Sequence, residues 1–403
     1  MNTCCCIVGG GPAGMMLGLL LARAGVEVVV LEKHADFLRD FRGDTIHPST
    51  LELMHELGIL EDFLKRPHQE VREAGGQIGQ DFVKLVDFSH LPTHCRFLVF
   101  MPQWEFLDFI SEQGARYPNF KVKTQTEVID LLEDEGRIVG VKATTPDGSI
   151  EIRADLVVGA DGRHSIVRER AGLEIENIGA PMDVLWFRLS RRTEDSYGVL
   201  GRIVSGRIMV MLNRQDYYQC GFIIRKGGIE QVKHRGLESF RQEIAAMVPF
   251  MGDRVGELKN WEDIKLLTVV VDRLRKWYRP GLLCIGDAAH AMSPIGGVGI
   301  NLAIQDAVAA ANILAERLSR GTATMVDLQR VQLRRDFPTR MTQGMQVFMQ
   351  NQVIERVLGG QQQLSLPWLL KLFNSWPFLR RIPARVIGIG FRAEHVKTVS
   401  REQ

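Results

Sequence analysis

The sequence has almost no net charge, which argues against a strongly basic or acidic binding surface. Its 50 basic and 48 acidic residues leave a formal net charge of +2, and the two signs are interspersed along the chain. Such a surface has no field that would gather the phosphates of nucleic acid. We therefore expect no nucleic-acid partner.

The six cysteines form no metal-binding or redox pattern. Three are consecutive, at residues 4–6, and the others stand alone at Cys95, Cys220 and Cys284. Zinc sites need ligands paired at short spacing, and redox pairs need C-x-x-C-type spacing. We expect no metal site and no disulfide. Reduced, buried cysteines favour a cytoplasmic location.

No stretch of sequence is apolar for long enough to span a membrane. The longest apolar run, residues 15–22, is far shorter than the ~20 residues that a bilayer requires. No basic segment leads into an apolar segment before the first predicted strand, so no signal peptide is expected. Internal repeats and low-complexity tracts are absent as well.

The composition that remains is that of an average globular protein. Hydrophobic residues make up 45% and charged residues 24% of the 403 positions, which indicates more than one packed domain. The first thirty residues predict a βαβ unit, with a strand at 4–8, a helix at 12–24 and a strand at 26–31. The fold class is therefore α/β, with a Rossmann-like βαβ unit at its start.

Two groups of strands follow. Alternating residues predict a three-stranded antiparallel insert over residues 121–129, 137–145 and 149–158. A meander that forms a separate sheet is predicted at residues 184–189, 198–204, 207–212 and 218–224. A later strand at 282–285 leads through a glycine-rich loop to a helix at 299–318. Beyond about residue 340 we expect helices, interrupted by Pro367, Pro377 and Pro383, that pack across the substrate side.

Aromatic residues gather in the predicted meander. Trp186, Phe187, Tyr217, Tyr218 and Phe222 would furnish one face over which a flat substrate lies, or they pack in the core. Tyr217, Tyr218 and Phe222 are the candidate substrate residues.

A glycine fingerprint joins the first strand to the first helix. Gly9, Gly11 and Gly14 occupy its first, third and sixth positions, and Pro12 and Ala13 open the helix. The first glycine permits the tight turn, the second lets a pyrophosphate approach the backbone, and the third lets helix and strand pack closely. The helix N-terminus then favours the phosphate anions. This motif alone permits NAD or FAD.

Two later motifs also lie at strand ends. Asp161 and Gly162, followed by Arg168, leave one apolar strand, and Gly286 and Asp287 leave another. Polar groups at the carboxyl ends of parallel strands face the crevice in which α/β sheets bind ligands. A single dinucleotide that meets three strand ends explains all three motifs. The loop after the last motif adds the candidates Pro294, Gly297, Gly299, Ile300 and Asn301.

Together these motifs resemble the single-component, class A FAD-dependent aromatic hydroxylases, the flavoprotein monooxygenase family of para-hydroxybenzoate hydroxylase. The resemblance covers about residues 1–340. It implies that FAD lies with its adenosine ribose at Glu32, beside Lys33, and with its ribityl chain at Asp287. In the family the Asp-Gly motif serves both FAD and a transient nicotinamide, which here implies Asp161 and Arg168.

Weaker correspondences concern single residues. Arg42 matches a family arginine near the FAD pyrophosphate, and Gln103 matches a position at the ribityl chain. No general base is identifiable. Tyr217, Tyr218, Arg207 and His47 are candidates, and His47 is preferred as the catalytic residue because it follows the Arg42 segment. His290 is expected to be structural.

The resemblance implies a discontinuous FAD-binding domain, an inserted β-sheet substrate domain and a C-terminal helical segment. Their bounds are 1–73, 98–175 and 268–340 for the first, 74–97 and 176–267 for the second, and 341–403 for the third. The aromatic and basic stretches at residues 366–373 and 376–381 close the pocket, form a subunit contact or rest on a membrane surface. The chain is expected to be a monomer or a homodimer.

The implied reaction uses FAD, NADPH or NADH, and O2 to hydroxylate a bulky aromatic molecule, a polyketide-like or quinonoid phenol, through a flavin C4a-hydroperoxide. Two alternatives stay open. One is an oxygen-independent flavin reductase or dehydrogenase of an isoprenoid, and the other is a non-catalytic FAD-binding protein. The W-x-W-x-I-P motif of flavin-dependent halogenases is absent, as is a second glycine fingerprint of the kind found in two-dinucleotide reductases.

Overall fold

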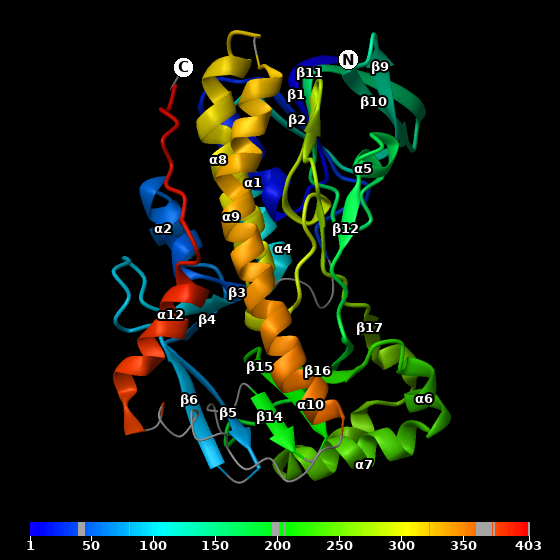
Figure 1. The fold of residues 1–403 in the computed structure, drawn as a ribbon, viewed down its shortest axis with the longest axis vertical. Coiled ribbons are helices and arrows are strands. Elements are labelled where there is room, and N and C mark those ends of the chain that lie inside the picture. Colours follow the sequence, from blue (N-terminus) through cyan, green and yellow to red (C-terminus); the bar gives the residue numbers. More distant parts are fainter. Residues whose placement is uncertain are drawn as a thin grey trace.

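Two sheets lie at opposite ends of an elongated molecule, and long helices run between them (Figure 1). The computed structural model of the chain describes residues 1–38, 45–79, 81–195, 201–204, 206–321, 323–359, 373 and 375–401. The first sheet has the order β19-β20-β11-β1-β2-β8, and β10 and β9 extend it from β11. Its strands are β1 (Asn2–Val8), β2 (Val28–Leu31), β8 (Phe120–Lys123), β9 (Glu127–Asp134), β10 (Arg137–Thr145), β11 (Gly148–Gly159), β19 (Tyr278–Arg279) and β20 (Leu282–Cys284).

The centre of the first sheet is parallel and buried on both faces. β1 pairs in parallel with β2 and β11, β2 with β8, and β11 with β20. Every residue of β2 is buried, as expected of a parallel strand that helices cover on both sides. The helices of this half are α1 (Pro12–Arg23), α2 (Pro48–Glu56), α3 (Leu60–Phe63), α4 (Gln103–Gly114), α5 (Ile166–Arg170) and α8 (Gly299–Leu318).

Two sequence predictions about this sheet need correction. The segment 121–129, predicted as one strand, forms the parallel strand β8 and the antiparallel strand β9. Gln125, which lies between them, has a φ of 50°, a left-handed conformation that ends one strand before the next begins. The antiparallel insert therefore consists of β9, β10 and β11, and β11 continues into the parallel sheet.

The second sheet has the order β17-β13-β16-β15-β14-β5-β6. β13 pairs with β16 over nine residues and not with β14, so the predicted simple meander is wrong. An apolar β13 gains more by burial between β16 and β17 than at a sheet edge. The strands are β5 (Glu73–Ile78), β6 (Asp81–Asp87), β13 (Met182–Ser190), β14 (Gly201–Val204), β15 (Arg207–Asn213), β16 (Tyr217–Arg225) and β17 (Lys265–Leu267).

Helices α6 (Ile229–His234) and α7 (Leu237–Met247) cover one face of the second sheet, and a buried cluster that includes Phe187, Phe222 and Phe240 lies between them and the strands. Two small sheets connect the halves. They are β3 (Thr45–Ile46) with β7 (Leu98–Phe100) and β4 (Gln69–Val71), and β12 (Ile175–Asn177) with β18 (Asp272–Leu274).

The C-terminal part follows a different course from the predicted one. α9 (Met325–Met349) is one helix through residue 340, where the sequence placed a domain boundary. Pro338 lies inside it, buried. α10 (Glu355–Leu358) and α12 (Arg381–Gly388) follow. α12 packs on β6, but residues 389–401 return to the first half, where the Arg401 N–H donates to the Arg23 carbonyl. Only part of the tail therefore covers the substrate side.

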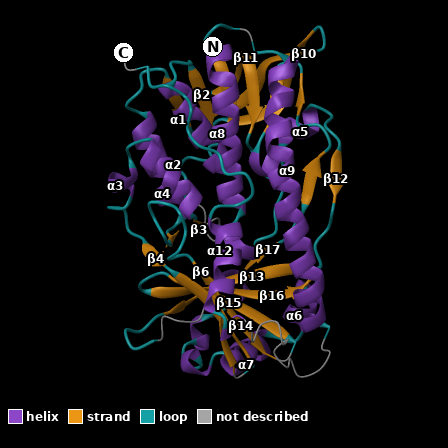
Figure 2. Cartoon of the chain, turned by 60° about the vertical axis from the view of Figure 1, so that its left-hand side comes forward, coloured by secondary structure: helices purple, strands orange, loops and turns teal. Residues whose placement is uncertain are grey.

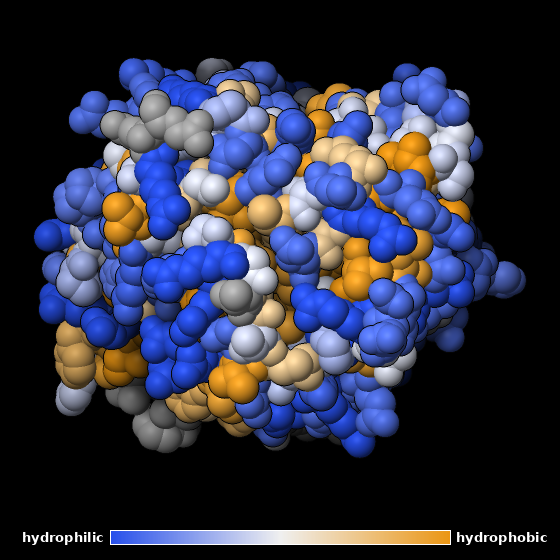
Figure 3. All heavy atoms as spheres, turned by 90° about the horizontal axis from the view of Figure 1, so that it is seen from above, coloured by the Kyte–Doolittle hydropathy of each residue, from blue (hydrophilic) through white to orange (hydrophobic). Residues whose placement is uncertain are grey.

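Figure 2 shows both termini at the end of the molecule that holds the first sheet. Seen from above, this end is covered mainly by hydrophilic residues, with hydrophobic residues between them (Figure 3). One segment of the described chain, Ile295–Leu318, is long and apolar enough to cross a membrane, but 78% of its most apolar window is buried inside the protein. It contains α8, the core helix that packs on α1.

Candidate active site

A cavity of about 1020 Å³ extends from the strand ends of the first sheet to the open face of the second, a volume at the upper end of ligand pockets. Its first half is lined by polar loops and holds the predicted glycine, Asp-Gly and Gly-Asp motifs. Its second half is lined by apolar side chains of β13, β15, β16 and β17 and of neighbouring segments. The two halves form one continuous space.

The glycine fingerprint turns sharply from β1 into α1. Gly9 has a φ of 107°, and a Cβ there would lie 2.4 Å from the Ala160 carbonyl oxygen. Gly11 lines the cavity, and a Cβ there would meet no atom within 4 Å. Pro12 and Ala13, which line the cavity as well, begin α1. This open, backbone-lined cradle at a helix N-terminus fits a pyrophosphate.

Glu32 lies at the end of β2 and is held in place by the backbone. The N–H of Gly10 donates to its Oε2 and the N–H of His34 to its Oε1, each at 3.0 Å. Lys33 beside it also lines the cavity. A carboxylate fixed in this way is suited to accept hydrogen bonds from ribose hydroxyls.

The Asp-Gly motif follows β11. Asp161 lines the cavity, and its Oδ2 accepts from the Val167 N–H at 3.2 Å. Burial raises the pKa of Asp161, and its Oδ1 is buried with no hydrogen-bond partner among the described residues. A buried acceptor without a partner fits a ligand that donates a hydrogen bond. Gly162, with a φ of 84°, also lines the cavity.

Arg168 lies behind these loops and not at the cavity. It is 7% exposed, its Nη2 lies 3.4 Å from Asp272 Oδ2, and its guanidinium also donates to the Arg163 carbonyl. Two other arginines, Arg163 and Arg170, line the cavity, and Nη2 of Arg163 lies 3.9 Å from Asp287 Oδ2. Arg163 was not among the predicted site residues.

The Gly-Asp motif follows β20. Gly286 has a φ of 58°, and a Cβ there would lie 3.1 Å from Ala303 Cβ and 3.2 Å from Ala13 Cβ. This close approach brings the turn against the N-terminal part of α1. Asp287, the next residue, lines the cavity with a side chain that is 35% exposed. It is accessible to a bound ligand.

The loop before α8 supplies backbone to the cavity. The lining residues of this loop include Pro294 and Gly297, and those of the first turn of α8 are Gly299 and Ile300. Gly297 has a φ of 62° and lies so close to Thr45 that a Cβ would be 2.8 Å from its hydroxyl oxygen. Gln103, the first residue of α4, lines the same space. Arg42 lies outside the described residues.

Asn301 is a structural link next to this loop. Its Oδ1 accepts from the His47 N–H at 2.8 Å and from the Thr50 hydroxyl at 2.7 Å, and its Nδ2 donates to the Thr45 carbonyl at 2.9 Å. It is 4% exposed and does not line the cavity. Its amide therefore joins α8 to β3 and α2.

His47 is also buried away from the cavity. Its Nδ1 lies 2.6 Å from the Ile387 carbonyl of α12, so this nitrogen carries the proton and donates. Burial lowers the pKa of His47 to about 4, which makes it a weak base. The structure does not place it where it would touch a substrate.

The predicted aromatic face is corrected by strand alternation. Tyr218 and Phe222 point into the core beneath α6 and α7, and neither lines the cavity. Tyr217 lies at the start of β16, with the guanidinium of Arg188 5.0 Å from its ring centre, and does not line the cavity. Trp186 does line it, because neighbours in a strand point to opposite faces.

The strand residues that line the apolar half lie on the same face of the sheet as Trp186. On β13 they are Met182, Val184 and Trp186, and on β16 they are Gln219, Gly221 and Ile223. The Trp186 ring covers Gly221, where a Cβ would lie 3.0 Å from it. Alternation within each predicted strand is the sequence signal that identifies them. Among the described lining residues of this half, none is ionisable.

A buried charge cluster supports the Gly-Asp turn. Asp306 accepts from the Gly286 N–H at 3.0 Å and from Arg335 Nε at 2.9 Å, and its Oδ2 lies 2.5 Å from His290 Nε2. Burial opposes ionisation of Asp306, but His290 and Arg335 outweigh it and lower its pKa. As expected, His290 has a structural position.

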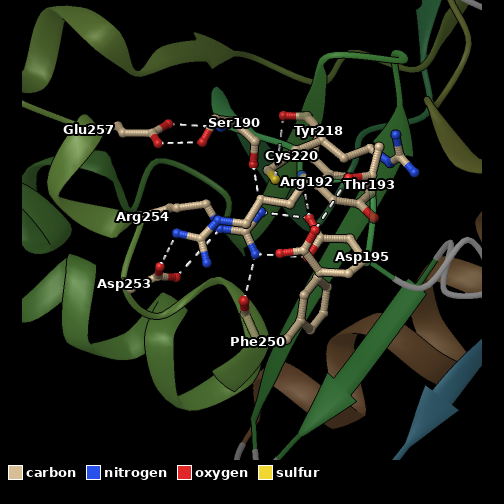
Figure 4. Close-up of polar contacts among 12 residues, drawn as sticks. Ser190, Arg192, Thr193, Asp195, Tyr218, Cys220, Phe250, Asp253, Arg254 and Glu257 are labelled. Atoms are coloured by element: carbon tan, nitrogen blue, oxygen red, sulfur yellow. Dashed lines mark hydrogen bonds and ion pairs between the residues drawn. The ribbon is translucent and has the colours of Figure 1, made fainter.

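A second buried ion pair lies outside the cavity (Figure 4). The Arg254 guanidinium donates to both carboxylate oxygens of Asp195, at 2.6 and 3.0 Å, and to the Ser190 carbonyl at 2.9 Å. The hydrogen bond from Arg254 holds the pKa of Asp195 below its usual value. This pair joins the end of β13 to the turn that follows α7.

Comparison with known proteins agrees with this architecture. Residues 2–344 match the model of the FAD binding domain family. The 6-methylpretetramide 4-monooxygenase of Streptomyces rimosus is 35% identical over 389 residues, which cover 96% of this chain and 92% of that one. The para-nitrophenol 4-monooxygenase of a Pseudomonas species is 24% identical, with 79% of each chain covered.

Solved structures share the fold. PqsL of Pseudomonas aeruginosa, described as a probable FAD-dependent monooxygenase, has a TM-score of 0.75 at 22% identity, with 89% of this chain and 99% of that one covered. The OxyS anhydrotetracycline hydroxylase of Streptomyces rimosus has a TM-score of 0.74 at 24% identity, with 96% and 76% covered. With the family match over most of its length, this chain belongs to the FAD-dependent monooxygenases of the aromatic hydroxylase type.

Proposed function

We propose that this enzyme hydroxylates a flat, fused-ring phenol of the polyketide type. The observation that carries the proposal is the continuous cavity, whose polar half has the features of a dinucleotide site and whose apolar half opens directly from it. A ligand in the second half is therefore adjacent to a cofactor in the first. The name of the 35% identical relative, a pretetramide monooxygenase, supports a substrate with several fused rings.

Bound FAD supplies the redox and oxygen chemistry, with NAD(P)H as the electron donor. One atom of O2 enters the product as a hydroxyl group and the other leaves as water, while the hydride of the nicotinamide supplies the two electrons and one proton is taken up. The protein binds and orients. In our proposal the backbone at Gly11 receives the pyrophosphate, Glu32 the adenosine ribose and Asp287 the ribityl chain. The N-terminus of α8 and its preceding loop offer N–H groups to negative charge on the flavin ring.

The apolar half orients the substrate by shape. Trp186, Val184 and Ile223 form an apolar wall of the cavity, and the indole nitrogen of Trp186 is buried without a hydrogen-bond partner among the described residues. Gln219 contributes a buried amide, which accepts from Arg214 Nε at 3.3 Å. Such a lining excludes water from the reacting atoms and provides no side-chain base among its described residues.

The test compares phenols of increasing ring number with the purified holoenzyme. The probes are para-hydroxybenzoate, a naphthol and 6-methylpretetramide, each assayed for NADPH-dependent oxygen uptake and, with heavy-oxygen-labelled O2, for label in the product. We expect labelled product and coupled NADPH use with the fused-ring probe. Equal or better turnover of the one-ring phenol would contradict the proposed substrate class, and NADPH oxidation that needs no oxygen would contradict the monooxygenase reaction.

A further inference from the structure

Helix α9 carries an exposed line of large apolar side chains. Val326, Leu333, Phe337, Met341 and Phe348 are 55, 65, 53, 41 and 65% exposed. Their spacing places them on one side of the helix, opposite the side that packs on the protein through residues such as Val331 and Gln346. In Figure 1, α9 passes in front of the two sheets, with no other helix or strand in front of it.

This line is symmetric about Phe337. Leu333 and Met341 lie four residues on either side of it, and Val326 and Phe348 lie eleven residues on either side. Any exposed helical face repeats at three and four residues, so symmetric positions alone carry little meaning. The helical repeat explains why exposed positions are spaced symmetrically, but it does not explain why all five of them carry apolar side chains.

Gly344 provides an independent observation on the same line. It lies seven residues after Phe337, is exposed, and would place a Cβ within 4 Å of no other atom. Glycine weakens a helix relative to alanine, and no packing against the described residues requires it here. A missing side chain on an exposed helical face lets another backbone or a long side chain approach closely. Arg330, the symmetric residue seven positions before Phe337, is a long side chain.

We propose that α9 pairs with α9 of a second copy of this chain, antiparallel, about a twofold axis at Phe337. A twofold interface brings the same surface of both copies together, so each residue meets its symmetric counterpart. Phe337 then faces the partner's Phe337, Leu333 the partner's Met341, and Val326 the partner's Phe348. Arg330 extends over the partner's Gly344.

The shape of the apolar line is better suited to contact with a partner helix than to contact with a lipid surface. It is about 33 Å long but only one to two residues wide, and Arg330 and Arg340 interrupt or border it. Interfacial helices insert a broad apolar face into a bilayer, whereas paired helices meet along a narrow seam. Phenylalanine and methionine are also enriched in interface cores.

The flanking charges do not oppose the pairing. Arg340 donates to Asp336 at 2.6 Å, and Arg334 donates to Glu394 at 2.7 Å. In the proposed pair, Arg334 of one copy lies near Arg340 of the other at the rim of the interface. Each of these arginines is already paired with a carboxylate of its own chain. A second copy of the chain is the partner because its α9 presents an apolar residue opposite each apolar residue of the line, and Gly344 opposite Arg330.

Sedimentation velocity on the FAD-loaded enzyme tests the proposal between about 1 and 100 µM protein. We expect the wild type to dimerise and the Phe337→Asp and Gly344→Arg variants to be monomeric at the same concentrations. Ile175→Asp, which adds the same charge at an apolar residue of β12 that is 46% exposed, is expected to stay dimeric. Unchanged unfolding temperatures would show that the variants are folded.

A cross-linking variant tests the axis itself. Phe337→Cys places one thiol on the twofold, and it is expected to form an intermolecular disulfide under mild oxidation, whereas Leu333→Cys alone is not. A wild-type monomer throughout the range, with or without binding to anionic vesicles, overturns the proposal. So does a dimer that Phe337→Asp leaves intact, because another surface would then hold it.

Discussion

A Cβ on Gly14 would lie 2.0 Å from the carbonyl oxygen of Gly9, so α1 touches the turn that precedes it with no room for a side chain. The space at Gly11, two residues after Gly9, is open toward the cavity. Two glycines of one fingerprint therefore serve different purposes. Gly14 is required by the protein itself, whereas Gly11 is required only if a ligand lies against it.

Replacement by alanine separates these purposes. Gly11 has an extended backbone conformation that any residue can adopt. Gly11→Ala is therefore expected to change the stability of the apoprotein by less than about 0.5 kcal/mol. Its FAD affinity should fall at least about tenfold. Gly14→Ala should lower apoprotein stability by about 1–3 kcal/mol through overpacking. Urea unfolding and flavin titration measure both, and normal FAD affinity in Gly11→Ala would contradict the assigned pyrophosphate cradle.

The Asp306 cluster predicts a coupled loss of stability and cofactor. Asp306→Asn removes the nearer carboxylate of Arg335, which is 1% exposed and keeps only Glu394, at 3.4 Å, as an acidic partner among the described residues. Breaking a buried pair in this way costs about 3–5 kcal/mol. Because Asp306 also holds the Gly286 N–H, FAD retention should fall as well. Both effects are measured on the same variant by urea unfolding and flavin absorbance.

An exposed pair provides the control for that variant. Glu316 and Arg320 are 68 and 65% exposed and lie 2.7 Å apart, so Glu316→Gln should cost no more than about 1 kcal/mol. If Asp306→Asn were no more destabilising than Glu316→Gln, the buried cluster would not have the supporting role assigned to it.

Alanine substitutions at two neighbouring residues of β13 are expected to have opposite effects on substrate binding and on stability. Trp186 lines the cavity, while Phe187 is fully buried in the core on the other face of the sheet. Trp186→Ala should raise KM for a fused-ring phenol several-fold with a small effect on stability, because it removes a cavity wall. Phe187→Ala should lower the free energy of unfolding by about 3–5 kcal/mol. Steady-state kinetics and urea unfolding measure both effects. A large loss of stability in Trp186→Ala together with a raised KM in a stable Phe187→Ala would refute the assigned faces.

The sequence predicts the dinucleotide half of the cavity better than the substrate half. Glycines and acidic residues at strand ends are constrained by local backbone geometry, so Gly9, Glu32 and Asp287 are recognisable from short motifs. Arg163 escaped notice because its contact with Asp287 joins segments more than one hundred residues apart.

The substrate half depends on strand pairing and strand faces. The predicted aromatic face placed Trp186 and Phe187 together, although adjacent strand residues cannot share a face. The pairing of β13 with β16 follows from burial across the whole sheet, which no local pattern encodes. The position of His47 away from the cavity was not predictable for the same reason. Its partner, Ile387, lies 340 positions away.

His47 predicts how stability depends on pH. Its pKa is lowered to about 4 in the folded protein, while an unfolded chain binds the proton near its ordinary value of about 6.5. Between these values the unfolded state holds more protons than the folded state, so acid favours unfolding. Stability from this residue is present above pH 6.5 and is lost as the pH falls, by about 2 kcal/mol at pH 5.

The matched variant is His47→Asn, whose side-chain amide can still donate to the Ile387 carbonyl but does not titrate. Urea unfolding at about pH 7 and pH 5 should show that the wild type loses about 2 kcal/mol more than the variant. All other titrating groups are common to both proteins, so the difference isolates this imidazole. Parallel losses in the two proteins would mean that His47 is not held in its neutral form, and its place between α2, α8 and α12 would then need another explanation.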